Sequence, residues 1–363
     1  MNYGEAFIYA KKVSYLEPVL ENDKFVYDEE AAEVRLQGAE VTAFPLTGDC
    51  RTIGTAGAET WYFAEGDIDI NDRLAVEGNV NLILCDGCNL TVVDGITVNE
   101  GDSLTFYGQK MRTGVLTAKG IKNNKAVIGG EGGYTNGNIT VNGGNINAVV
   151  KFKGTHSWGF ADEGSFAGIG GGWGGSGKNI TINAGTVYAK GGNGAAGIGG
   201  SGYNNCTDIT INGGKVHAVG GSGGAGIGGG YYGDASNIII NGGYVRAIGE
   251  GAGIGGGTDD YDTEDMDDGE YEEWSYERLG MPLRSLMGKV RNLQINGGTV
   301  EATGDYCAMG SPYSTGDEFI EDTITVADDC AIYAGSDEET AVPVEKSNYL
   351  NGTMNYKYIK IDF

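Results

Sequence analysis

Short segments in which apolar and polar residues alternate recur through most of the chain. In each of them Ile or Val occupies every second position, which is the period of a half-buried β-strand. From about residue 126 onward the segments come in pairs, of which the first ends in Asn and the second begins with Gly. The clearest copies are NITVN at 138–142, NITIN and GTVYA at 179–183 and 185–189, DITIN and GKVHA at 208–212 and 214–218, NIIIN and GYVRA at 237–241 and 243–247, and NLQIN and GTVEA at 292–296 and 298–302.

A third phrase, AGIGG, precedes the pairs and sets the period of the repeat. It is centred on Ile169, Ile198, Ile227 and Ile254, so successive copies lie 29, 29 and 27 residues apart. Three short strands in such a period predict a coil in which each strand pairs with its copy in the next coil, about 4.8 Å away. Because parallel crossovers are right-handed, we expect an all-β, right-handed parallel β-helix with three-strand coils of about 27–29 residues.

The Asn that ends each NITIN-type strand keeps one phase in the repeat, and a Gly follows it two residues later. We expect these amides to stack as a ladder at a turn, next to glycines in a backbone conformation that disfavours a Cβ. A ligand site made by the Asn row is the alternative. The row consists of Asn142, Asn183, Asn212, Asn241 and Asn296.

Outside the regular repeat, the pattern predicts caps and insertions. Residues 1–58 do not repeat and are expected to form an N-terminal cap, which would cover otherwise unpaired strand edges. Residues 59–335 are expected to form the β-helix, with insertions at 151–166 and 258–291. Residues 336–363 are expected to add a C-terminal cap strand.

Composition and charge narrow the classes of partner. The chain has 67 Gly but only 5 Pro, and its net charge is −26. This charge argues against binding to nucleic acid or to anionic membranes, and we expect no membrane span. Sequons of the NIT type on packed strands indicate a bacterial source rather than a glycosylating pathway. No signal segment is visible, so the sequence is expected to be a mature or excised piece.

The sequence motifs of the repeat are similar to those of one group of proteins. The phrases that carry the likeness are VNLILCDGCNLTV at 80–92, GITVNEGDSLTFYGQ at 95–109, the AGIGG repeats and the closing YKYIKI at 356–361. Over about residues 60–335 the chain resembles glycine-rich, secreted or cell-surface β-helix modules of gut-type anaerobic bacteria. The resemblance implies display as part of a larger surface protein and carbohydrate binding or adhesion, and it supplies no catalytic motif.

Aromatic residues follow the AGIGG phrase, about one or two in each coil. Stacked along one edge, such rings would form a flat platform on which sugar rings can lie. Aromatic residues of the two insertions are expected to border the same edge. The alternative is that the rings cover the glycine face and each other. The candidate ligand-binding residues are Trp173, Tyr203, Tyr231, Tyr232, Tyr261, Trp158 and Trp274.

A second candidate site is the outward row of the GTVYA-type strands. It presents Tyr188, His217, Arg246 and Glu301 at coil spacing. A base, a cation and an acid in one row favour a polysaccharide lyase or glycoside hydrolase as an alternative function, although the paired carboxylates of a typical glycosidase are not evident. Surface salt-bridging is the alternative without catalysis.

The insertion at 258–291 holds a third candidate, an acidic run. Its spacing does not satisfy the DxDxDG pattern of a Ca²⁺ loop, so a solvated loop and a Ca²⁺ site both stay open. Ca²⁺ is the one cofactor that the sequence suggests. The candidate metal ligands are Asp262, Glu264, Asp265, Asp267 and Asp268.

Together, these patterns favour an extracellular or bacterial cell-surface module that binds polysaccharide or another glycan along the aromatic edge without catalysis. A polysaccharide lyase or glycoside hydrolase acting at the outward row is the first alternative. A structural stalk or protein-binding adhesin is the second. Whether the protein is an enzyme is left open by the sequence.

Overall fold

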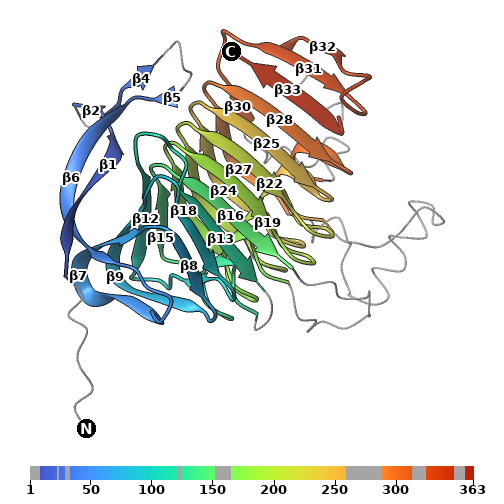
Figure 1. The fold of residues 1–363 in the computed structure, drawn as a ribbon. Coiled ribbons are helices and arrows are strands. Elements are labelled where there is room, and N and C mark those ends of the chain that lie inside the picture. Colours follow the sequence, from blue (N-terminus) through green and yellow to red (C-terminus); the bar gives the residue numbers. More distant parts are fainter. Residues whose placement is uncertain are drawn as a thin grey trace.

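The computed structural model describes residues 9–22, 24–28, 33–120, 124–151, 165–258, 288–312, 324–346 and 356–363. Every element with bounds in these ranges is a β-strand, and the strands stack as successive rungs between the two ends of the molecule (Figure 1). Each coil supplies three rungs, and each rung pairs in parallel with its counterpart in the next coil. The chain is therefore an all-β parallel β-helix, as the repeat predicts.

The AGIGG phrases form the shortest rungs, the first ladder. Their isoleucines are register partners from coil to coil, beginning with Ile128 and Ile169. The strands of this ladder are β11 (Ile96–Thr97), β14 (Ile128–Gly129), β17 (Ile169–Gly170), β20 (Ile198–Gly199), β23 (Ile227–Gly228), β26 (Ala252–Gly255) and β29 (Cys307–Gly310).

The NITIN-type segments form the second ladder. In the first coils it merges with the first ladder, because β7 (Thr52–Ala64) and β9 (Leu74–Leu84) run through the corner. β9 pairs with β11 through Leu74 and with the second ladder from Asn79 onward. The strands of the second ladder are β12 (Ser103–Gly108), β15 (Asn138–Val141), β18 (Gly177–Ile182), β21 (Cys206–Ile211), β24 (Ala235–Ile240), β27 (Val290–Ile295) and β30 (Ile324–Val326).

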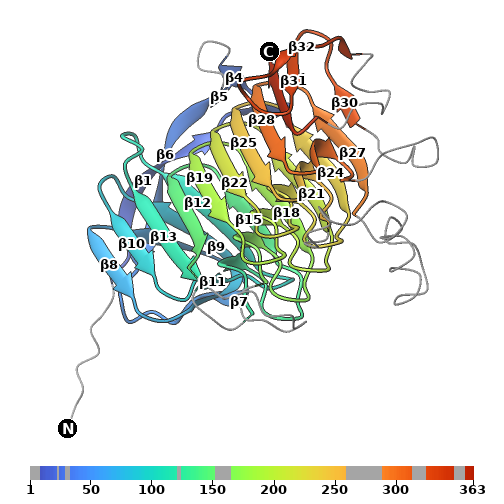
Figure 2. The same cartoon turned by 90° about the vertical axis from the view of Figure 1, so that its right-hand side faces the viewer.

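The GTVYA-type segments form the third ladder, whose rungs follow one another across one face (Figure 2). Its parallel strands are β8 (Asp67–Ile70), β10 (Asn89–Val92), β13 (Val115–Gly120), β16 (Asn145–Val150), β19 (Thr186–Lys190), β22 (Lys215–Val219), β25 (Tyr244–Gly249) and β28 (Thr299–Gly304). The C-terminal strand β33 (Tyr358–Asp362) then lies antiparallel between β28 and β31 (Ala331–Gly335), and β32 (Val342–Pro343) pairs with β31.

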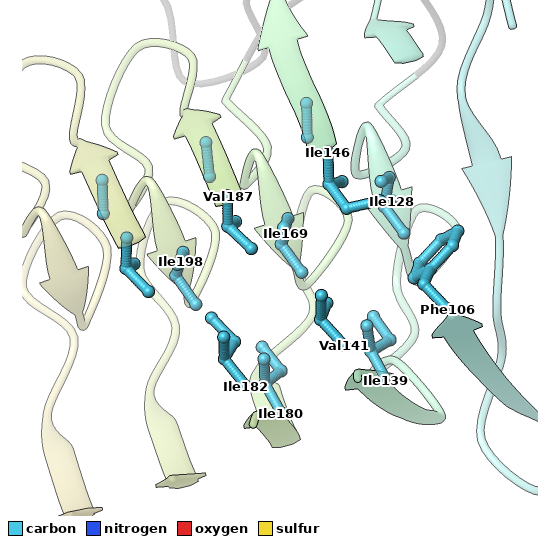
Figure 3. Close-up of a cluster of buried hydrophobic side chains, with 14 of the residues drawn as sticks. Phe106, Ile128, Ile139, Val141, Ile146, Ile169, Ile180, Ile182, Val187 and Ile198 are labelled. Atoms are coloured by element: carbon cyan, nitrogen blue, oxygen red, sulfur yellow. The ribbon is translucent and has the colours of Figure 1, made fainter. Parts of the chain in front are cut away.

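The core is a set of aliphatic columns inside the coils. Figure 3 shows apolar side chains from all three strands of a coil pointing into one interior, with the next coil repeating the arrangement. Ile169, Ile180 and Val187 come from the three strands of one coil and are at most 1% exposed. Full burial of such a side chain stabilises the fold by about 1.5–3 kcal/mol. The alternation in the sequence therefore places the core correctly.

Two glycine columns let the coils approach each other. The Gly after the Ile of each AGIGG phrase has φ 138 at Gly170, 137 at Gly199 and 144 at Gly228, a region that L side chains rarely adopt. A Cβ on Gly199 would overlap the carbonyl oxygen of Gly228 in the next coil. The glycine two residues after each ladder Asn, such as Gly214 at φ 83, is also left-handed, as predicted.

The predicted asparagine ladder is confirmed. Each side-chain Nδ2 donates to the Oδ1 of the preceding coil: Asn183 to Asn142 at 2.7 Å, Asn212 to Asn183 at 2.7 Å, Asn241 to Asn212 at 2.8 Å and Asn296 to Asn241 at 2.8 Å. Asn142, Asn183 and Asn212 are buried. The row therefore satisfies buried amides within the scaffold, as the structural interpretation of the sequence expected.

A second polar ladder was not predicted. The residue that opens the repeat NIT, expected to be an ordinary strand residue, is left-handed, with φ between 52 and 59 at Asn179, Asp208, Asn237 and Asn292. This residue has no register partner in the neighbouring coils, so each copy is a bulge residue on the outer surface. Asn237 donates to Asp208 at 3.0 Å, and Asn292 donates to Asn237 at 2.9 Å.

The N-terminal residues form an arm beside the coils. β1 (Lys11–Pro18) pairs antiparallel with β6 (Leu36–Pro45), and short pairs extend it: β2 (Leu20–Glu21) with β3 (Lys24–Phe25), and β4 (Tyr27–Asp28) with β5 (Glu33–Val34). Figure 1 shows the arm curving along one side of the stack. The Tyr27 hydroxyl donates to Asn212 Oδ1 at 3.4 Å, so the arm covers part of the asparagine ladder.

Candidate functional site

Three of the predicted aromatic residues form one group, the tyrosine cluster of Tyr203, Tyr231 and Tyr232. Ring centroids lie 5.0 Å apart for Tyr203 and Tyr231, 5.9 Å for Tyr203 and Tyr232, and 4.4 Å for Tyr231 and Tyr232. The rings are inclined to one another by 50–70°, which is the edge-to-face arrangement that aromatic pairs favour. Tyr203 keeps 52% of its surface exposed, so the cluster presents rings to solvent.

Two of these tyrosines adopt a backbone conformation that suits glycine. Tyr203 has φ 64 and Tyr232 has φ 57, five residues after the Ile of their AGIGG phrases. The same place is held by Gly133 (φ 83) and Gly174 (φ 76) in the two preceding coils. A non-glycine residue in this region costs about 1–3 kcal/mol, and such strain gathers at functional sites. The scaffold thus does not require tyrosine at these two positions.

Glycines of the neighbouring turn support the cluster from beneath. The Tyr231 amide donates to the Gly194 carbonyl at 2.7 Å. A Cβ on Gly223 would lie 2.7 Å from the Tyr231 ring, so the ring packs closely on that glycine. A side chain at Gly223 would displace the ring. The glycine-rich connection therefore fixes the place of Tyr231.

Both predicted insertions begin or end beside this cluster. Ser165, near the end of the predicted first insertion, accepts the Gly202 amide at 3.4 Å, one residue before Tyr203. Thr258, the first residue of the predicted second insertion, is buried and donates its amide to Gly223 at 2.8 Å. The chain leaves and re-enters the coil at one place, since the Gly288 amide donates to Gly257 at 3.0 Å. The attachment points of both insertions thus border the tyrosine cluster.

Trp173 extends the same edge by one coil. It occupies the position equivalent to Tyr231, four residues after the Ile, and 37% of its surface is exposed. Its backbone is held on both sides, because its amide donates to Asn124 at 2.8 Å and its carbonyl accepts the Gly133 amide at 2.7 Å. We call Trp173 and the tyrosine cluster together the aromatic edge.

The aromatic edge changes to polar contacts in the coil before Trp173. There Glu131 accepts Lys125 at 2.6 Å and lies within 3.4 Å of the Thr97 hydroxyl. Arg73 reaches the same corner and donates to Thr97 at 2.6 Å and to the Ala126 carbonyl at 2.8 Å. Burial lowers the pKa of Arg73 to about 10, which leaves it charged at neutral pH. This enclosed cation was not predicted, because its backbone partners come together only in the fold.

The remaining candidates of the sequence analysis lie outside the described residues. These are Tyr261, Trp158 and Trp274 as ligand-binding residues, and Asp262, Glu264, Asp265, Asp267 and Asp268 as Ca²⁺ ligands. Within the described ranges, no group of three or more His, Cys, Asp or Glu side chains is placed to hold a metal ion. Likewise, no helix in those ranges is long and apolar enough to cross a membrane.

The outward row of the third ladder is assembled as predicted. Tyr188, His217, Arg246 and Glu301 are successive register partners on β19, β22, β25 and β28. The rings of Tyr188 and His217 meet edge to face, with centroids 5.2 Å apart. Sequence reasoning missed Tyr244, whose hydroxyl donates to Glu301 Oε2 at 2.7 Å. Its place two residues before Arg246, on the same face of β25, was the signal that could have revealed it.

The electrostatics of this row keep its histidine neutral. Burial and then the nearby Arg246 lower the pKa of His217 below its ordinary 6.5, and its Nε2 is buried without a hydrogen-bond partner among the described residues. Burial and the hydrogen bond to Glu301 raise the pKa of Tyr244 to about 12. The Glu301 carboxylate is therefore occupied by a tyrosine that stays protonated.

Comparison with known proteins agrees with the coil architecture. The family model of the β-helix repeat matches residues 180–203, 209–231, 238–258 and 293–316. This is a β-helix protein. No curated protein and no solved structure matches the chain. Each matched stretch runs from a second-ladder strand through a third-ladder strand to the next AGIGG phrase, so the matches reproduce the period found in the sequence.

Proposed function

We propose that this protein is a non-catalytic glycan-binding module that takes polysaccharide on the aromatic edge. Sugar rings present flat apolar faces, and aromatic side chains on a rigid support bind such faces with little loss of conformational freedom. Because Trp173 and the tyrosine cluster belong to three consecutive coils, the edge offers rings along a line, which suits a chain of sugars.

The observation that carries the proposal is the left-handed backbone of Tyr203 and Tyr232. The scaffold accepts glycine at this position, as Gly133 and Gly174 demonstrate, and glycine there carries no strain. A tyrosine that raises the energy of the fold and exposes its ring is explained by a use for that ring. Binding is such a use.

The proposal extends to the setting of the module. Its repeats resemble those of glycine-rich surface modules of gut-type anaerobic bacteria, and its net charge of −26 suits a protein exposed to solvent. We therefore place it outside the cell or on the bacterial surface, as part of a larger protein. Ca²⁺ held by the acidic insertion belongs to the same proposal. An unchanged melting temperature after addition of EDTA would count against a structural ion.

A glycan array tests the function directly. The wild-type protein is expected to bind a subset of polysaccharides, and Trp173→Ala and the double variant Tyr203→Gly/Tyr232→Gly are expected to bind them at least about tenfold more weakly. Tyr333→Ala is the matched control, because Tyr333 is 36% exposed and lies on β31, away from the edge. A blank array, or equal binding by all variants, would refute the proposal.

A further inference from the structure

One surface of this acidic protein carries no acid at all. On β13, β16, β19, β22 and β25 the outward side chains number three per strand and include no Asp or Glu, although the chain has 50 acids against 24 Lys and Arg. The same positions hold four cations and two exposed or half-buried tyrosines. We call this surface the basic strip; it consists of Lys119, Lys190, Lys215 and Arg246, with Tyr188, Tyr244 and His217 among them.

The strip is rigidly arranged, because its residues are held by ladder pairing. His217 lies between Tyr188 and Arg246 in one row, and Lys215 is the register partner of Tyr244 in the adjacent row. Neighbouring strands are about 4.8 Å apart, so the five strands span about 19 Å. Every strand of the strip except β16 therefore presents one cation, and β19, β22 and β25 also present a ring. The third-ladder strands follow one another across one face (Figure 2).

The cations of the strip are not used by the fold. None of Lys119, Lys190, Lys215 and Arg246 forms an ion pair with a described residue. Elsewhere the protein pairs lysines readily, as with Lys178 and Glu100 or Lys346 and Asp328 at 2.7 Å. Glu301 is the register partner of Arg246, but none of the four cations is held in an ion pair with a described residue, so ion pairing within the fold does not account for the cluster.

Acidic side chains border the basic strip at both of its ends. β8 presents Asp67 and Asp69 outward before it, and β28 presents Glu301 after it. A polyanion is therefore attracted to the strip itself and repelled beyond it. This favours a bound segment of a few charges, not unlimited attraction along the whole face.

We propose that the basic strip is a binding site for a linear polysaccharide bearing carboxylate groups, that is, a uronate polymer. Arg246 offers a planar fork that suits a carboxylate, the lysines add point charges, and Tyr188 and Tyr244 offer rings to the sugars. Four cations over about 19 Å match the widely spaced charges of such a polymer better than those of duplex DNA, which carries one charge per about 1.7 Å. This site lies on another ladder from the aromatic edge and does not depend on it.

The test is a titration with polygalacturonate, followed by calorimetry at low and at physiological salt. Lys215→Glu/Arg246→Glu is expected to weaken binding at least about tenfold. Lys11→Glu/Lys12→Glu is the matched control, because it changes the net charge equally on the N-terminal arm. The carboxyl-reduced polymer is expected not to bind the strip. Melting curves confirm that each variant is folded.

Four results would overturn the proposal. The strip variant could bind as tightly as wild type, or the arm variant could lose as much affinity, which would indicate a general charge effect. Single-stranded DNA of the same total charge could bind equally well, which would make the strip a nucleic-acid site. Release of unsaturated sugar fragments would show an active site around His217 and Arg246 instead of a binding site.

Discussion

At the scale of single residues, the aromatic edge depends on Tyr203 and Tyr232, whose backbone is left-handed. The aromatic residues after AGIGG were found from their spacing, and Tyr203, Tyr231 and Tyr232 do lie together. Their left-handed backbone was not foreseen, because a tyrosine in a glycine position becomes visible only when the coils are superposed on one another. The acid-free face was likewise missed, since it is formed by residues of five separate strands.

Replacing the strained tyrosines with glycine separates stability from binding. In Tyr203→Gly/Tyr232→Gly, relief of the left-handed strain offsets the lost ring packing and the greater freedom of the unfolded chain. We expect the free energy of unfolding to change by less than about 1 kcal/mol per site, while glycan affinity falls. Denaturant melts paired with binding titrations measure both. A loss of several kcal/mol would instead make the tyrosines structural.

His217 gives the protein a specific pH dependence. The pKa of His217 is lowered in the fold, so the unfolded chain binds a proton more readily than the folded chain. The neutral side chain therefore contributes its full share to the free energy of unfolding above pH 6.5. This contribution is lost as the pH falls below 6.5. The groups facing it are Tyr188 on β19 and Arg246 on β25, with Lys215 on its own strand. Wild type is therefore expected to lose more stability between pH 7.5 and 5 than His217→Gln. Equal losses in both proteins would contradict this account.

At the scale of the strand, register was predictable and bulges were not. Inward Ile and Val repeat with period two, and a slip by one residue would turn them all outward, so the pattern alone specifies which copies pair. The left-handed residue at Asn179 and its equivalents places two outward residues in succession, so the inward residues Gly177 and Ile180 are three apart. The bulge was missed because the strands were taken to begin at this residue. The asparagine ladder was predictable because identical amides at one phase must meet.

Replacing an Asn at the centre of the asparagine ladder should lower the free energy of unfolding more than replacing the one at its end. Asn212 donates to Asn183 through a buried bond and accepts from Asn241 through a partly buried one, so Asn212→Ala leaves the Asn183 Oδ1 and Asn241 Nδ2 atoms without their ladder partners. Each buried group left unpaired costs about 1–3 kcal/mol. We therefore expect Asn212→Ala to lower the free energy of unfolding by about 2–4 kcal/mol. Asn296→Ala, at the exposed end, should cost less than half as much. Similar losses in chemical denaturation would indicate that the ladder does not act as a buried network.

At the scale of the whole molecule, the coils and the arm are held by different contacts. Each coil shares backbone ladders and buried columns with its neighbours, whereas β1 and β6 pair mainly with each other and reach the coils through contacts such as Tyr15 against Trp61 and Tyr107. The arm was not foreseen as a strap along the coils, because its short strands carry no repeat. Its course is decided by tertiary contacts such as Tyr27 with Asn212.

The arm is expected to open before the coils unfold. Amide protons of β6 should exchange through a local opening, while those of β18 and β21, buried between neighbouring rungs, should need global unfolding. Hydrogen exchange followed by mass spectrometry distinguishes the two sets. Exchange of both sets at one rate over a range of denaturant concentrations would show that arm and coils form a single cooperative unit.

Ring resonances of tyrosine test the central claim most directly. Tyr203→Phe and Tyr232→Phe assign the two signals in protein with isotope-labelled tyrosine, and a polysaccharide selected on the array is then titrated in. The ring signals of Tyr203 and Tyr232 are expected to shift in a saturable way, while that of Tyr333 is expected to stay in place. Saturable binding that leaves both rings of the aromatic edge unmoved would contradict it.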